Sequence, residues 1–212
     1  MKYTRWQFLF PPRPDAAIPS AMLAFYEKKG WSAQYKKNGT NTIIGISPEK
    51  EFTAMTRHKT EHKAWQLTGH IKKELTRLFP EAEWFVLCAE IMHSKTPTIK
   101  DTIYIHDCLV WQGEFLLNST FAERCKLLDD RMIPNSVSES ESHYVCDTEG
   151  KIWFAKRFTK KFKEIFQAIK NVKIDEGLVL KDPEGKLRAC SRPDDNSGWQ
   201  VKCRHQAKGY AF

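Results

Sequence analysis

The sequence has no apolar run long enough to cross a membrane and no recognisable export signal. A membrane span needs about 18 consecutive apolar residues, and no stretch of the 212 residues approaches that length. The apolar part of the N-terminal MKYTRWQFLFPPRP is too short for a signal peptide and ends at prolines. We therefore expect a cytoplasmic protein that spans no membrane.

Patterns that would bind a structural metal are also missing. The six cysteines stand at positions 88, 108, 125, 146, 190 and 203, and no two of them form a Cys-x-x-Cys pair, which argues against a zinc ribbon. The seven histidines show no spacing typical of metal ligands. Without an export signal, we expect the cysteines to be reduced thiols.

Acidic residues are fewer than basic ones. The chain has 26 Asp and Glu against 34 Lys and Arg, which gives a net charge of +8 and a pI of about 9.1. An anionic partner is therefore expected, such as a nucleic acid, a nucleotide or an anionic membrane surface. Hydrophobic residues make up 41% of the chain, which is enough for a core. We predict a single domain over residues 1–212.

Hydrophobic periodicity predicts helices and strands that alternate without a regular βαβ rhythm. The expected helices cover residues 17–30, 61–79, 120–131 and 153–172. The expected strands cover residues 31–37, 40–47, 83–92, 102–111, 176–182 and 198–205, with a hairpin turn at Asn38-Gly39. The polar, Ser-rich segment 135–143 is expected to be a mobile loop. This pattern predicts an α+β fold with largely antiparallel sheets.

Charged residues on or beside the predicted strands are the candidate site. Burying a charge on a sheet is costly unless it has a partner or a ligand. Each such residue alone is a weak signal, because a single Glu at a strand end is most often solvated. The set consists of Lys36 in YKKNGT, Glu90 in LCAEIM, Glu176 in EGLVLK, and Lys202 with Arg204 in WQVKCR.

The order and spacing of these motifs resemble the covalent nucleotidyltransferases, which comprise ATP-dependent DNA ligases, RNA ligases and mRNA capping enzymes. KKNG resembles the family's Lys-x-Asp-Gly motif, AEI its acidic third block, and YIHDCLV its aromatic-Asp strand. EGLVLK and VKCR resemble its fourth and fifth motifs. The resemblance spans residues 20–208. It implies a ligase catalytic domain of largely antiparallel sheets flanked by helices, and no C-terminal OB-fold, since only eight residues follow Arg204.

The resemblance implies that a lysine amine attacks the α-phosphate of ATP, forms lysyl-AMP and releases pyrophosphate. A lysine with a pKa near ~10.4 is protonated at pH 7, so neighbouring cations or desolvation must free the amine. The Lys-x-x-Gly spacing selects Lys36, because Lys37 leaves only one residue before Gly39. Lys37 is expected on the opposite face of the strand, exposed to solvent.

The other predicted site residues also follow from the resemblance. Arg57, Lys181, Lys202 and Arg204 would hold phosphates, Glu90 the ribose hydroxyl, and Glu176 a divalent metal, Mg²⁺ or Mn²⁺. Gln34 would read the adenine edge, and Gly39 would leave room for the nucleotide. Two positions depart from the family: His106 stands where an aromatic shelf for adenine is usual, and Arg204 replaces the usual Lys.

The implied function is that of an ATP-dependent polynucleotide ligase, which joins 3′-hydroxyl and 5′-phosphate ends of DNA, RNA or a hybrid at a nick. KKNGTN favours an RNA ligase, whereas DCLVWQGEFL with ERCKLL favours a DNA ligase, so both stay open. The expected partner is a nicked duplex and not a membrane. Eight Lys and Arg between 151 and 173 could grip the duplex or form a solvated face. Two alternatives remain: an adenylyltransferase that needs an accessory protein for sealing, and a non-catalytic nucleic-acid-binding module.

Overall fold

The computed structural model describes residues 1–14, 16–96 and 98–205. The strands within them are β1 (Ala16–Ala17), β2 (Ser32–Lys37), β3 (Thr40–Ile46), β4 (Phe52–Thr56), β5 (Phe85–Met92), β6 (Thr102–Trp111), β7 (Glu114–Phe115), β8 (Ser138–Glu139), β9 (His143–Val145), β10 (Ile152–Ala155), β11 (Asp175–Lys181) and β12 (Gln200–Arg204). The α-helices are α1 (Leu23–Lys28), α2 (Gly69–Leu78), α3 (Phe121–Met132) and α4 (Phe162–Ala168).

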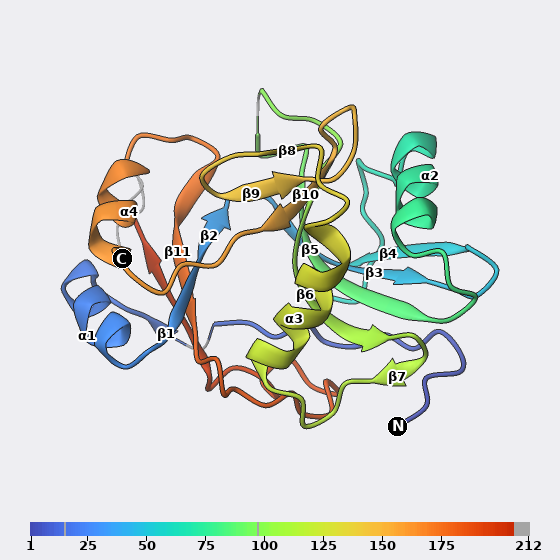
Figure 1. The fold of residues 1–212 in the computed structure, drawn as a ribbon, viewed down its shortest axis with the longest axis horizontal. Helices are drawn as coiled ribbons and strands as arrows, with labels where there is room; N and C mark the ends of the chain where they lie inside the picture. Colours follow the sequence, from blue (N-terminus) through green and yellow to red (C-terminus); the bar gives the residue numbers. More distant parts are fainter. Residues whose placement is uncertain (15, 97, 206–212) are drawn as a thin grey trace.

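The strands form two sheets that lie side by side (Figure 1). The smaller sheet has the order β1-β12-β11-β2, and the larger has the order β4-β3-β5-β6-β10-β9-β8, with β7 paired to β6. Among the described strands, only the β1–β12 and β6–β10 pairs are parallel. The expected α+β class with largely antiparallel sheets is confirmed.

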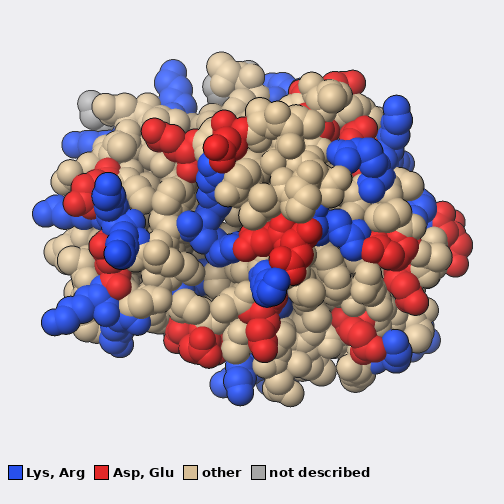
Figure 2. Space-filling view, viewed as in Figure 1, with Lys and Arg blue, Asp and Glu red and all other residues tan. Residues whose placement is uncertain are grey.

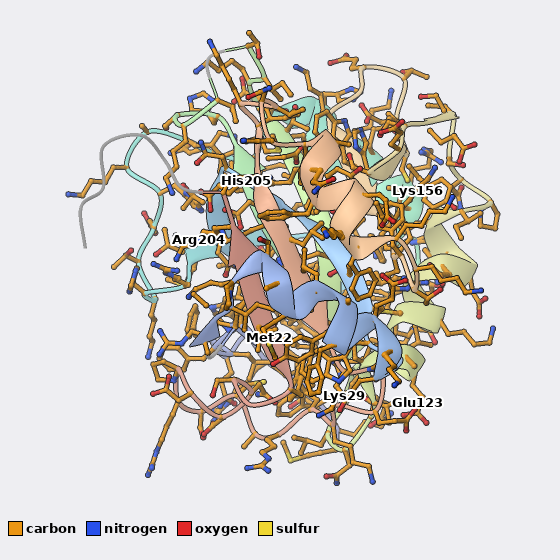
Figure 3. All side chains as sticks on the ribbon, turned by 90° about the vertical axis from the view of Figure 1, so that its left-hand side faces the viewer. Met22, Lys29, Glu123, Lys156, Arg204 and His205 are labelled. Carbon is orange, nitrogen blue, oxygen red and sulfur yellow. The ribbon has the colours of Figure 1, made fainter. Side chains whose placement is uncertain are left out.

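Helices cover one face of each sheet and leave the space between the sheets open. Helices α1 and α4 lie over the four-stranded sheet, as Figure 3 shows, and bury Leu23, Phe162 and Phe166 against it. Helices α2 and α3 pack on the eight-stranded sheet through an apolar cluster that includes Leu75 and Leu128. The N-terminal segment packs on the other face of that sheet.

The predicted hairpin at Asn38-Gly39 is wrong. Strand β2 pairs with β11 in the smaller sheet, whereas β3 pairs with β4 and β5 in the larger one. Neither Asn38 nor Gly39 has the positive φ that a type I′ turn requires, so the chain bends there and passes from one sheet to the other. Gly39 is needed for packing, because a Cβ there would lie 2.5 Å from the carbonyl oxygen of Ile91.

The helix predicted over 61–79 is shorter in the structure. Helix α2 begins after Thr68, whose side chain accepts a hydrogen bond from the Ile71 amide at 3.2 Å. The residues before it are irregular, although Trp65 and Leu67 still enter the core. Their apolar spacing therefore reflected burial rather than helical structure.

The long helix predicted over 153–172 is also wrong. Its first part is strand β10, which pairs with β6 in parallel, and only Phe162–Ala168 is α-helical. The four residues of β10 are all buried, so the apolar run belongs in a sheet. The expectation that the phenylalanines are core residues is confirmed, since Phe154, Phe162 and Phe166 are buried.

Three residues of the segment 135–143, which was predicted to be a mobile loop, belong to strands of the larger sheet: Ser138 and Glu139 in β8 and His143 in β9. Strand β8 pairs with β9 at the sheet edge. Ser142 and His143 are buried, and the amide of Lys156 donates to the carbonyl of Ser142 at 3.1 Å. The hydroxyls of Ser140 and Ser142 make local hydrogen bonds, among them to the ring of His143 and, for Ser140, from the amides of Ser142 and His143. The mobility of the segment stays a prediction.

All six cysteines are free thiols, as predicted, and the structure shows that all six are buried. Burial raises the pKa of the Cys125 and Cys190 thiols to about 12. Among the described residues, the helices are too short and too polar to cross a bilayer.

A buried ion pair fixes α3 to the larger sheet. Arg124 on α3 donates two hydrogen bonds to Asp107 on β6, at 2.9 and 3.1 Å, and a third to the carbonyl of Ser119 at 2.9 Å. Both side chains are almost fully buried. Arg124 holds the pKa of Asp107 below its usual value despite the burial. A capping box between Thr120 and Glu123 starts the same helix.

Replacing Arg124 by methionine should therefore destabilise the fold strongly. The Arg124→Met change leaves Asp107 as a buried, uncompensated charge, which costs about 3–5 kcal/mol. The matched change Lys126→Met lies on the same helix at a side chain that is 73% exposed, and it should cost less than about 0.5 kcal/mol. Urea unfolding measures both, and similar costs for the two variants would contradict this role of the pair.

Candidate active site

A cleft of about 1210 Å³ lies between the two sheets and is lined by residues from both. The smaller sheet contributes side chains from β2, β11 and β12, and the larger sheet contributes side chains from β3, β5 and β6. All ten site residues predicted from the sequence line this one cleft: Gln34, Lys36, Gly39, Arg57, Glu90, His106, Glu176, Lys181, Lys202 and Arg204.

Lys36 and Glu176 form an ion pair across the β2–β11 ladder. Lys36 is paired with Gly177 and Lys37 with Asp175, so β11 carries one extra residue, Glu176, at a β-bulge. Gly177 has a φ of +143°, and a Cβ there would overlap the carbonyl of Cys203. Only glycine fits this position, and the bulge places the Glu176 carboxylate against the amine of Lys36.

Three cations line the same part of the cleft. Lys202 and Arg204 lie on β12 beside Val179 and Gly177, and Arg57 follows β4, where its amide donates to the carbonyl of Asn41 at 3.1 Å. Within the part of the chain that the structure describes, none of the three forms an ion pair with a carboxylate. Burial and then the neighbouring cations, Arg204 first, lower the pKa of Lys202. The arrangement favours an anionic ligand.

Glu90 and Asn41 stand on the opposite wall, on β5 and β3. Burial raises the pKa of Glu90 to about 7, although the nearby cations, led by Lys36, oppose the shift. The buried side-chain oxygen of Asn41 has no hydrogen-bond partner among the described residues. Such an orphaned acceptor at the cleft wall fits a ligand that brings a donor, such as a hydroxyl.

Gln34, His106 and Lys181 also lie together in the cleft, and a nitrogen of the His106 ring is 3.5 Å from the side-chain nitrogen of Asn41. The side-chain amides of Gln34 and the amine of Lys181 lie 3.3 and 3.5 Å from the carbonyl oxygen of His106. Burial, followed by the charge of Lys181, lowers the pKa of His106 to about 3, so its ring is neutral. A neutral ring beside an amide suits a flat, uncharged base.

Lys181 lies on β11, in the same sheet as Lys202 and Arg204. It pairs with Gln200 on β12, two residues before Lys202. Its amine lies 4.5 Å from the centre of the Phe121 ring, and burial lowers its pKa. The structure groups Lys181 with Gln34, and its phosphate-binding role stays a prediction.

The acidic groups at the cleft fit a metal ion that is shared with a ligand. No cluster of three or more His, Cys, Asp or Glu side chains suited to a metal occurs among residues 1–14, 16–96 and 98–205. Glu90 and Glu176 do face the same cleft. Mg²⁺ typically binds one or two carboxylates together with phosphate oxygens and water, and this donor set fits that mode.

Sequence reasoning missed the burial of Lys37 and the contribution of the segment 58–65 to the cleft. Lys37 was expected in solvent, but its side chain is 1% exposed and lies 2.8 Å from Asp175. The segment 58–65, most of which was predicted to be helical, lines the cleft instead, and its His62 lies 2.9 Å from the hydroxyl of Thr42. The neighbouring charges in DEGLVLK were the one available signal for a partner of Lys37.

No protein-family model and no curated protein matches the sequence. Solved structures are similar in fold. A mycobacterial DNA ligase D complexed with ATP and MES matches at 14% identity and a TM-score of 0.62, over 92% of this chain and 60% of that one. The ligase domain of M. tuberculosis LigD matches at 16% identity and a TM-score of 0.57, over 92% and 59%.

An archaeal ATP-dependent RNA ligase matches at 18% identity and a TM-score of 0.50, over 92% of this chain and 48% of that one. This chain thus spans about half to three fifths of the length of these structures. At these identities the likeness concerns the fold. The chain has the fold of the ATP-dependent DNA and RNA ligase catalytic domains, the ligase nucleotidyltransferase fold.

Proposed function

We propose that this chain is an ATP-dependent nucleotidyltransferase that attaches AMP to Lys36 and, as a polynucleotide ligase, joins 3′-hydroxyl to 5′-phosphate ends. The observation that carries the proposal is the cleft in which Lys36 meets Glu176 beside Arg57, Lys202 and Arg204. A primary amine surrounded by cations without carboxylate partners suits attack on a phosphate.

The reaction forms one bond and breaks one. The Nζ atom of Lys36, after its ammonium proton passes to the solvent, bonds to the α-phosphorus of ATP. The bond from that phosphorus to the bridging oxygen of the β-phosphate breaks, and pyrophosphate leaves with the electron pair. Lys202, Arg204 and Arg57 stabilise the negative charge that develops on the phosphate oxygens. Glu176 is the carboxylate in contact with Nζ, and its metal, Mg²⁺ or Mn²⁺, would supply further positive charge there.

The rest of the nucleotide fits the remaining cleft residues. Glu90 and the free oxygen of Asn41 accept hydrogen bonds from the ribose hydroxyls. Gln34 offers an amide to the edge of adenine, and the neutral ring of His106 lies beside the base. Gly39 packs against Glu90 and Ile91 with no room for a Cβ, and its part in leaving room for the nucleotide stays a prediction.

The polynucleotide substrate is a nicked duplex of DNA, RNA or both. The structures that resemble this one include a DNA ligase and an RNA ligase, so the fold supports both classes. The basic segment 151–173 has eight Lys and Arg, but fewer of these charges are available to bind duplex phosphates. Lys156 pairs with Glu139, and Arg157 pairs with Asp129. Basic and acidic side chains are interspersed over the face seen in Figure 2. The reaction would take place in the cytoplasm, where thiols stay reduced.

Incubation with α-labelled ATP and Mg²⁺ should label the protein covalently, and Lys36→Ala should abolish the label. Lys63→Ala, which removes another lysine that lines the cleft, should keep it. α-Labelled GTP should give no adduct. If Lys36→Ala is labelled as strongly as the wild type, the site assignment fails.

The pKa of Glu90 predicts how stability depends on pH. The native pKa of about 7 exceeds the ordinary value of 4.5, so the folded state retains a proton that the unfolded chain releases. Glu90 therefore lowers the free energy of unfolding progressively as pH rises from about 4.5 to about 7. Glu90→Gln should gain stability relative to the wild type across that window, by up to about 3 kcal/mol, and stay level above it. Thermal unfolding at several pH values tests this, and a pH-independent difference would contradict it.

A panel of nicked duplexes tests the joining step. The labelled protein, freed of ATP, should transfer AMP to a 5′-phosphate and join the nick in at least one DNA, RNA or hybrid duplex. Joining that appears only after a cell extract is added would instead support an adenylyltransferase that needs an accessory protein.

A further inference from the structure

Lys37 and Asp175 form a buried ion pair directly behind the proposed nucleophile. Because side chains alternate along a strand, Lys36 faces the cleft and Lys37 faces the other side of β2. The two side chains of the pair are 1% and 5% exposed. The amine of Lys37 lies 2.8 Å from Asp175 and donates to the hydroxyl of Ser142 at 3.0 Å.

This pair lies where the two sheets meet. Lys37 and Asp175 belong to the smaller sheet, whereas the amine also lies 5.4 and 5.7 Å from the ring centres of Tyr104 on β6 and Trp153 on β10. The hydroxyl of Ser142, the residue that precedes β9, also forms a hydrogen bond of 2.8 Å with Nδ1 of the His143 ring. One buried ammonium group thus contacts strands of both sheets.

Burying the Lys37–Asp175 pair costs free energy, because both charges lose their contact with water. Burial lowers the pKa of Lys37 and raises the pKa of Asp175, so the protein disfavours both charges. A buried ion pair can often be replaced by apolar residues of similar volume without loss of stability, whereas removal of one partner is costly. Stability alone therefore gives no reason for these charges.

The neighbours of the pair give a reason. Lys37 follows Lys36, and Asp175 precedes Glu176, so the ion pair closes the ladder at the bulge that brings Lys36 and Glu176 together. The contacts of the Lys37 amine with the rings of Tyr104 and Trp153 also fix the position of β2 relative to the larger sheet, which carries Glu90 and His106. The contacts of Lys37 therefore connect the two walls of the cleft.

We propose that Lys37 and Asp175 are a positioning pair, which holds Lys36 and Glu176 in the geometry that aims the Lys36 amine at the α-phosphate. The inference rests on the proposed function and extends it to two residues whose side chains are buried in a pair with each other. A misplacement of about 1 Å can cost about 100-fold in rate. The pair therefore acts on the covalent step rather than on nucleotide binding.

The test separates stability from positioning. The variants are Lys37→Met, Asp175→Val and the double variant. Each single variant should unfold at a lower temperature, and the double variant should recover most of that loss because no buried charge is left unpaired. The single-turnover rate of labelling at saturating ATP should still be about 100-fold below wild type in the double variant. Its dissociation constant for ATP should change by less than about threefold, since the groups proposed to bind the nucleotide are intact.

Two controls keep the result interpretable. The exposed pair Lys126–Asp130 on α3 offers a matched double variant, Lys126→Met with Asp130→Val, which should label at the wild-type rate. Asp175→Asn keeps the shape of the side chain, and should slow labelling at least about tenfold even if the apolar double variant does not fold.

The possible outcomes are distinct. Wild-type labelling rates in a folded double variant, or in Asp175→Asn, would overturn the inference and leave the proposed function intact. A fall in ATP affinity that accounts for the whole loss of labelling would also overturn it. A wild-type protein that takes up no label would overturn the proposed function, and the positioning role with it.

Discussion

The contact between Lys36 and Glu176 is the interaction on which the account of the site depends. It lies at a bulge where β11 carries one residue more than β2, and where Gly177 lets β11 approach Cys203 without a side chain. Asp175 lies opposite Lys37, and the extra residue Glu176 contacts Lys36. The two acids thus pair with the two adjacent lysines, one pair at the cleft and one buried.

The cleft lies at the boundary between the two sheets and is lined by residues of both. The smaller sheet supplies the lysine, its glutamate and two cations, and the larger supplies Glu90 and His106. The chain crosses between them at Asn38 and Gly39, immediately after the nucleophile, so the sequence motif and the sheet crossing coincide. The relative position of the sheets therefore decides whether the two halves of the site can act on one molecule. The contacts of Lys37 lie at this boundary and involve residues of both sheets.

The residues predicted for the candidate site line one cleft in the structure, whereas some of the elements that carry them were predicted wrongly. Lys36, Glu90, Glu176 and Lys202 lie on short apolar strands, where a charge stands out against its neighbours, and the structure brings them to one cleft. The burial of Lys37 could not be predicted, because alternation indicates only which face the side chain takes. What covers that face comes from β6 and β10, which are distant in the sequence.

The helix predicted over 153–172 failed for a similar reason. Its phenylalanines recur at a spacing that fits a helix, but the first of them belongs to β10, whose place is fixed by parallel pairing with β6. Local pattern cannot reveal a long-range partner. The Asn-Gly turn failed because the residues that demand glycine at position 39 are Glu90 and Ile91 on another strand, and not the geometry of a hairpin.

The most direct test of the central claim is to locate the adduct. Protein incubated with ATP and Mg²⁺ is digested under mildly alkaline conditions, which preserve a phosphoramidate, and its peptides are mapped by mass spectrometry. The account predicts AMP on the peptide that contains YKKNGT, with the fragment ions assigning it to Lys36 rather than Lys37. AMP on any other residue, or no adduct in a folded protein that binds ATP, would contradict the account.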